Sequence, residues 1–141
     1  MGPEKRLNAY LRQVRSKPFR WGEHDCLIFS NAAFTAYHGA GYADDLVGGY
    51  MADGEPALPS RLRDRFNAES FDEVVERKLR RVDYVPPRGA LVATKRAERW
   101  LIGYALGICV GTKAAFLSRG GVIYVSLDDI DKSWVPKCKQ R

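Results

Sequence analysis

The sequence predicts an α+β fold, with helices in its first part and an antiparallel sheet after them. Apolar residues recur at helical spacing from about residue 4 to residue 80. After Pro86 and Pro87 they instead form short runs that are typical of strands. A Gly-containing turn at 118–121 separates two of these runs and predicts a hairpin. Helices and strands are thus segregated along the chain, which favours α+β over an alternating α/β fold.

Four stretches are expected to be helical: 4–15, 25–38, 57–66 and 70–80. The stretch 25–38 is unusually apolar and rich in small residues, so we expect it to be the central helix, ended by Gly39. Ser70 and Glu73 match a capping box, which predicts the start of the last helix. Residues 40–56 read as a long loop, and loops of this length are more often functional or partner-binding than idle.

Four apolar runs are expected to be strands: 90–93, 100–110, 114–117 and 122–125. The tail at 128–134 is polar, and we expect Trp134 and Val135 to return and cover the sheet. The chain has 141 residues and no internal repeat, so 1–141 is interpreted as a single domain.

Composition excludes some classes of function. No apolar run approaches the roughly 20 residues that span a bilayer, and no apolar stretch follows the charged start, so neither a membrane span nor a signal peptide is expected. The net charge is +6, but basic residues alternate with acidic ones at 61–65 and 76–81, as on solvated helix faces. Nucleic-acid binding is therefore not expected. An acidic partner protein or a cell-envelope polymer is equally compatible with this charge.

Three cysteines, Cys26, Cys109 and Cys138, are too few and too scattered for a disulfide scaffold or a zinc knuckle. With only two histidines as well, we expect no metal and no cofactor. Cys109 is interpreted as a core strand residue and Cys138 as an exposed tail thiol.

Cys26 is the candidate nucleophile. It follows the turn signal Trp21-Gly22 and begins the central helix, where helix-end amides and the helix dipole favour thiolate over thiol. The alternative is that Cys26 is a small buried hydrophobe at the start of a core helix. We expect Trp21 to pack against the core and hold the turn before Cys26.

The motif Trp21-Gly22-x-x-Asp25-Cys26, opening a helix ahead of a strand meander, resembles the NlpC-type papain-like cell-wall peptidases, above all a phage tail-associated branch. Further segments are similar to that family, and the likeness runs from about residue 5 to 136. These segments are Gly89-Ala90-Leu91-Val92, Ala105 to Gly111, the turn Gly120-Gly121-Val122, and Trp134. The resemblance implies a papain-like fold with N-terminal helices packed on a C-terminal antiparallel sheet.

The resemblance also implies site residues. Cys26 takes the nucleophile position, but the position of the catalytic histidine falls on Ala105, which can neither accept nor donate the proton of the relay. The acidic residue of the Gly-Asp strand opening is replaced by Ala90, and Ser118 is the candidate for the third, orienting residue.

Other side chains are poor substitutes for the missing base. His38 follows Cys26 by twelve residues on one expected helix, roughly 18 Å away. His24 is a weak candidate, because side chains at i and i+2 do not face each other on a helix, although the loop before the helix could curl it back. Both histidines are expected to cap helix ends or bond to backbone. Tyr104 has an ordinary pKa near 10 and is a poor base.

The favoured hypothesis is a structural and interaction component of a phage or phage-derived tail tip, a papain-like domain that has lost its relay and packs among other tail hub proteins. Its expected location is the host cytoplasm during assembly and then the virion tail. The alternative is a cysteine peptidase or amidase that uses Cys26 to cut the peptide stems of peptidoglycan. A basic nucleic-acid-binding module is a third hypothesis. Two questions stay open: whether Tyr37, Tyr42 and Tyr50 form a core edge or an interface, and whether the 40–56 loop covers the cleft.

Overall fold

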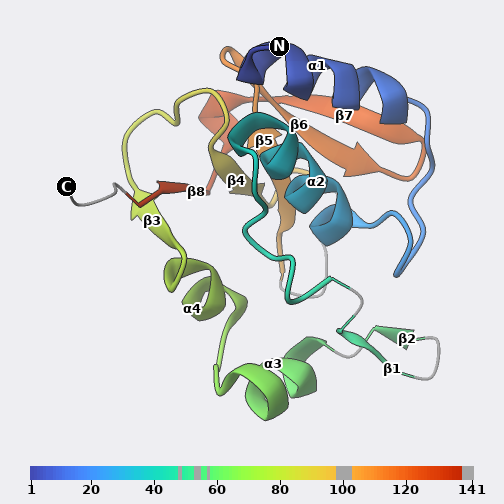
Figure 1. Cartoon of the computed structure of the whole chain (residues 1–141), viewed down its shortest axis with the longest axis vertical. Helices are drawn as coiled ribbons and strands as arrows, with labels where there is room; N and C mark the ends of the chain where they lie inside the picture. The colour runs from blue at the N-terminus through green and yellow to red at the C-terminus, as the bar shows by residue number, and fades with distance from the viewer. Residues whose placement is uncertain (48, 53–54, 57, 98–102, 138–141) are drawn as a thin grey trace.

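Two helices pack on one face of a six-stranded antiparallel sheet, so the predicted α+β class is confirmed (Figure 1). The computed structural model describes residues 1–141 except 48, 53–54, 57, 98–102 and 138–141, and within 52–61 it describes the backbone alone. The sheet has the order β3-β8-β4-β5-β6-β7, and every neighbouring pair is antiparallel. Its strands are β3 (Leu79–Val82), β4 (Leu91–Thr94), β5 (Ala105–Cys109), β6 (Lys113–Ser118), β7 (Gly121–Ser126) and β8 (Lys132–Pro136).

The helices covering the sheet are α1 (Pro3–Val14) and α2 (Cys26–His38), as predicted. Helix α1 buries Leu7, Leu11 and Val14, the apolar stripe that its sequence spacing indicates. Helix α2 ends at Gly39, whose φ of +87° suits glycine at a left-handed helix end.

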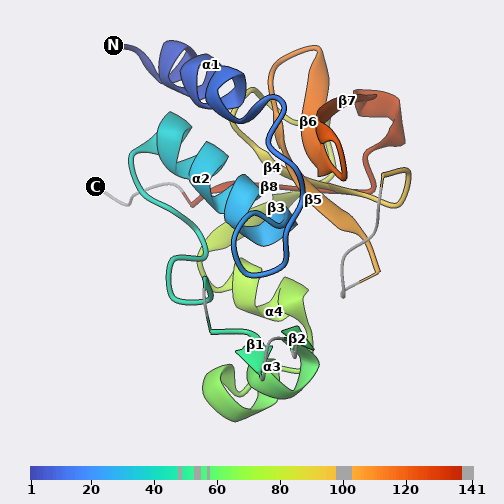
Figure 2. The ribbon, with the colours of Figure 1, turned by 90° about the vertical axis from the view of Figure 1, so that its right-hand side faces the viewer.

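A smaller group of elements lies below the sheet in both ribbon views (Figure 2). It contains α3 (Leu58–Phe66), α4 (Phe71–Glu76) and the two-stranded ribbon of β1 (Met51–Ala52) and β2 (Glu55–Pro56). Ser70 caps α4 by accepting a hydrogen bond from the Glu73 N–H, which confirms the predicted start. Polar contacts dock α4 on the sheet: Asp72 pairs with Lys132, and Trp134 donates to Glu76.

The predicted helix at 70–80 is wrong in its last part, because α4 ends at Glu76 and 79–82 is strand β3. Leu79 and Val82 have the i, i+3 spacing of a helix stripe. In the structure, however, they are buried in two different apolar clusters, on opposite faces of the sheet. Pairing of β3 with β8 sets this geometry, and that pairing joins segments about fifty residues apart.

The interpretation of the tail was also wrong in one respect. Trp134 does not lie over the sheet: β8 is inserted in it, between β3 and β4, and Trp134 is fully buried. The hairpin predicted at 118–121 is confirmed as the turn between β6 and β7. The expected strand at 100–110 appears as β5 from Ala105 onward, while 98–102 lies outside the described residues.

Each face of the sheet carries its own buried cluster. The helix-side face is defined by Leu91, Leu106, Ile108 and Trp134, which pack with α1 and α2. The far face is defined by Ala90, Ala105, Cys109 and Phe116. Side chains alternate along a strand, so neighbouring residues of β5 belong to different faces.

Candidate functional site

Asp25 organises the start of α2. Its carboxylate is fully buried, and Oδ1 accepts the Ile28 N–H at 3.0 Å, which caps the helix. Oδ2 accepts the Gly22 N–H at 3.0 Å and also the Tyr50 hydroxyl. Gly22 has a φ of +77°, which a tight turn tolerates best at glycine. One side chain thus ties together the turn, the helix and the loop that follows it.

Cys26 is the first residue of α2, and its side chain is 2% exposed. The backbone of Leu106, on the neighbouring strand β5, lies close enough to the thiol to act on its pKa and lower it. Burial raises the pKa of Cys26 far above its ordinary value and outweighs the backbone hydrogen bonds that lower it. At neutral pH the group is therefore a thiol and not a nucleophilic thiolate.

Two tyrosines from the long loop bond to residues beside Cys26 at the start of α2. Tyr42 is 3% exposed, and Tyr50 is fully buried. Tyr42 shares a 2.7 Å hydrogen bond with the Ser30 hydroxyl, and Tyr50 donates to Asp25. Both phenols are close enough to Cys26 to interact electrostatically with it, and burial is the main cause of their raised pKa. Tyr42 and Tyr50 are therefore core residues, in the same buried cluster as Cys26.

His24 does not supply the missing base. It is 2% exposed, its ring stacks edge-on against Phe29 with centroids 6.2 Å apart, and Nε2 has no partner among the described residues. Burial lowers its pKa, followed by the charge of Lys17, while Asp25 acts in the opposite direction. Within the described part of the chain no hydrogen bond joins His24 to Cys26.

Ala105 and Ala90, where the resemblance places the histidine and the acidic residue, are both buried on the far face. The residues of this region on the helix-side face are Tyr104 and Leu106. Tyr104 donates to Asp72, and burial raises its pKa, so it is not a base near neutral pH. The sheet thus directs no relay residue from position 105 toward Cys26.

The two remaining candidates are engaged elsewhere. His38 Nε2 lies 2.7 Å from the Gly89 carbonyl oxygen, a backbone contact of the kind predicted, at the far end of α2 from Cys26. Ser118 donates to the Gly121 carbonyl at 2.7 Å, which stabilises the hairpin turn. Trp21 packs against the helix-side core, as predicted.

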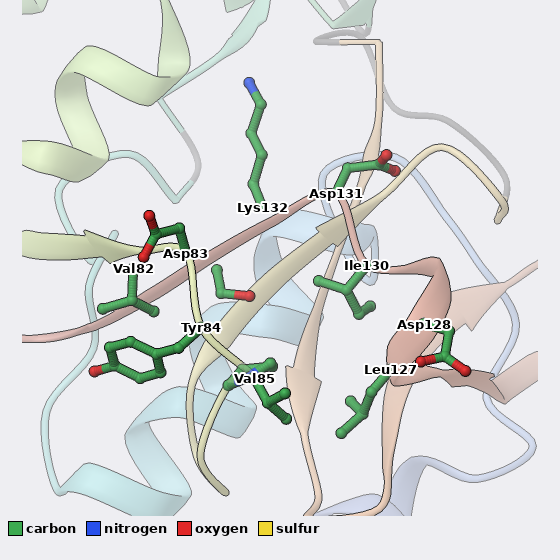
Figure 3. A pocket seen from close by; sticks show the side chains of 11 residues that line it. Val82, Asp83, Tyr84, Val85, Leu127, Asp128, Ile130, Asp131 and Lys132 are labelled. Atoms are coloured by element: carbon green, nitrogen blue, oxygen red, sulfur yellow. The ribbon is translucent and has the colours of Figure 1, made fainter.

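A cavity of about 430 Å³ lies elsewhere, on the far face (Figure 3), and a second of about 610 Å³ is lined by the first five residues. Asp83, Tyr84 and Val85 line the far-face cavity from the segment after β3. Leu127, Asp128, Ile130 and Asp131 line it from the segment between β7 and β8. The side chain of Lys132 points away from it and pairs with Asp72. Cys26 is not among the lining residues.

Metal ligands do not gather in the structure: among the described residues no group of three or more His, Cys, Asp or Glu side chains could hold an ion. The described helices also include none that is long and apolar enough to cross a membrane. Cys109 is buried in the far-face core, as predicted, and Cys138 lies outside the described residues.

A family model matches residues 2–135, from the start of α1 into β8, and so takes in the helices and the sheet. The chain belongs to the DUF6950 family. That family is described as a domain of unknown function. No curated protein and no solved structure matches this DUF6950 chain.

Sequence reasoning missed two features of this domain. The sequence places Tyr42 and Tyr50 near each other, but nothing local shows that they are buried with Cys26, because this depends on how the loop folds back. The sequence analysis assigns no role to Asp83-Tyr84-Val85. Two large apolar side chains beside an aspartate were the available signal, and the cavity itself depends on how the segment before β8 packs against them.

Proposed function

We propose that this DUF6950 domain is a degenerate NlpC-like, papain-like domain that acts as a structural and interaction component of a phage or phage-derived tail tip. The likeness rests on the Trp21 to Cys26 motif, on a cysteine at the start of a buried helix, and on an antiparallel sheet packed against that helix. Its proposed partners are other tail hub proteins. Fold likeness alone does not carry activity, so the state of the thiol decides between scaffold and enzyme.

The observation that carries the scaffold proposal is the sealed Cys26. A cysteine hydrolase needs a thiolate, a base in hydrogen-bond reach and room for an acyl group. Here the thiol is 2% exposed with a raised pKa, and the groups around it are Asp25, two phenols and the Leu106 backbone. These features favour a packing role for Cys26.

The test has two arms. Purified chain is incubated with purified peptidoglycan, and the release of new amino groups and soluble fragments is followed for wild type and Cys26→Ala. The scaffold proposal expects no release that depends on Cys26. Release that disappears in Cys26→Ala overturns it. In the second arm, purified tails are analysed for the chain, which must be present in assembled particles.

The second candidate is a peptidoglycan cysteine peptidase or amidase with Cys26 as nucleophile. It is favoured by one observation, the place of Cys26 at the helix start, where backbone hydrogen bonds act to lower its pKa. This candidate requires Tyr42 and Tyr50 to move and a base to come from another chain. It predicts that Tyr50→Ala, which opens the cover, produces Cys26-dependent cleavage when tail proteins are added.

A further inference from the structure

Strand β7 forms an edge of the sheet, and its sequence lacks the usual protection against pairing with another strand. Residues 121–126, Gly-Val-Ile-Tyr-Val-Ser, contain no charge and no proline. Ile123 and Tyr124 are 37% and 54% exposed. The opposite edge, β3, carries exposed Arg80 and Arg81, the kind of charged side chain that blocks edge pairing. The two edge strands, at opposite ends of the strand order, thus differ in charge.

The backbone of β7 presents hydrogen-bonding groups outward. Val122 donates its N–H to the Arg15 carbonyl at 3.0 Å, so at residue 122 these groups point away from β6. Their direction alternates along an antiparallel strand, so the groups of Tyr124 and Ser126 also point outward. Among the described residues, none accepts a hydrogen bond from the Tyr124 N–H. An added strand can therefore pair here, while Arg15 covers the first part of the edge.

The two ends of β7 carry opposite charge. Arg15 and Arg119 lie at its start, and Asp128 and Asp129 follow its end. Two basic residues offset the acidic end in part: Lys113 lies opposite Ser126 on β6, and Arg96 pairs with Asp129 at 3.9 Å. Asp128 remains the acidic side chain at this end without an ion pair among the described residues. A second β7 running antiparallel places each basic end beside the acidic end of the other copy. A parallel strand would instead put like charges together.

We propose that β7 is a self-association edge, at which two copies of this chain pair antiparallel about a two-fold axis at Val125. In this register Tyr124 of each copy exchanges a pair of backbone hydrogen bonds with Ser126 of the second copy. The chain enters a 3₁₀ helix at Leu127–Asp129, so the ladder ends at the Tyr124–Ser126 pairs, with Ile123 of one copy near Leu127 of the second copy on the far face. Pairing centred closer to Val122 is blocked by the Arg15 carbonyl. This inference does not depend on the proposed tail function.

The first experiment measures mass against protein concentration by sedimentation or light scattering. The proposal expects a concentration-dependent dimer. Tyr124→Lys should raise its dissociation constant about tenfold or more, because it puts two ammonium groups near the axis. Val47→Lys is the control, since Val47 is 38% exposed and belongs to the segment after α2, and it should leave the dimer unchanged. Added salt should weaken the dimer by screening the strand ends.

A monomer at every concentration overturns the proposal and is the result expected if the edge accepts a strand of a different protein. A dimer that Tyr124→Lys leaves intact overturns it as well. Circular dichroism of each variant checks that the fold is retained.

The second experiment tests the register by crosslinking in a Cys138→Ser background. Val125→Cys pairs with itself across the axis as a non-hydrogen-bonded pair, with Cα atoms about 4.5 Å apart, within disulfide range. Under mild oxidation it should form a covalent dimer. Ile123→Cys faces Leu127 of the second copy and should not. The reverse result, or crosslinking of neither variant in a sample that is dimeric by mass, overturns the β7 register.

Discussion

The two faces of the sheet each bury a cysteine but differ in what surrounds it. On the helix-side face Cys26 is buried in the same apolar cluster as Tyr42 and Tyr50. On the far face Cys109 is also buried, but the same face leaves a cavity of about 430 Å³ with three aspartates in its lining. Cys26, the residue that the sequence motif marks for chemistry, therefore lies on one side of the sheet. This cavity lies on the other side.

A cysteine at the start of a helix is therefore not by itself a catalytic site. The same helix-end amides are present whether or not water reaches the sulfur, and burial outweighs them here. Four predictions test the difference between the buried surroundings of Cys26, called the sealed face, and the far face around the cavity, called the open face.

The largest expected effect is on stability at the sealed face. Asp25→Ala should lower the free energy of unfolding by about 3 kcal/mol, because it removes a helix cap and leaves buried donors without an acceptor. Asp128→Ala, at the open cavity, should change it by less than about 0.5 kcal/mol. Urea denaturation of both variants measures this, and equal losses would contradict the comparison.

Thiol reactivity should come next. At pH 8, Cys26 should be alkylated about a hundredfold more slowly in the folded protein than in the urea-unfolded chain, because it is occluded and held as thiol. Tyr50→Ala should restore much of the rate. Peptide-level mass spectrometry separates Cys26 from Cys109 and Cys138. Fast labelling of Cys26 in the folded wild type would show that the cover opens readily.

Removal of one hydroxyl should give a smaller effect. Tyr50→Phe should cost about 1 to 2 kcal/mol, since it removes a buried hydrogen bond to Asp25 while keeping the ring. The matched change on the open face, Tyr84→Phe, should be neutral within about 0.5 kcal/mol. Thermal or urea unfolding of the pair is the measurement, and the prediction fails if Tyr84→Phe is the more damaging.

The smallest effect concerns pH. Burial lowers the pKa of His24 below its ordinary 6.5, so between the two values the unfolded chain binds more protons than the folded one. The free energy of unfolding should have its full value above pH 6.5. It should fall as the pH drops from 6.5 to the folded-state pKa of His24. His24→Phe should reduce the slope of the free energy of unfolding against pH. The remaining slope should come partly from His38, whose pKa is also lowered by burial. An unchanged slope in His24→Phe would show that the imidazole does not contribute.

Much of the helical part of the fold could be predicted from residues. Leu7, Leu11 and Val14 indicate α1, and Ser70 with Glu73 locates the start of α4. Local rules failed at 77–80, where the helix was predicted to continue but the chain leaves α4 and enters β3, which a long-range strand pairing holds. They failed again at Trp134, because nothing local reveals that the last strand enters the sheet between β3 and β4.

By itself, the sequence determined the α+β class, the cap and start of α2 at Asp25 and Cys26, and the hairpin between β6 and β7, because each depends on residues only a few positions apart. Tertiary packing sets the burial of Cys26 in one cluster with Tyr42 and Tyr50, the place of Ala105 on the far face, and the cavity on that face. The physical reason is that solvent access and the face that a strand residue occupies depend on packing between distant segments. The pKa of Cys26 follows from that packing and not from its motif.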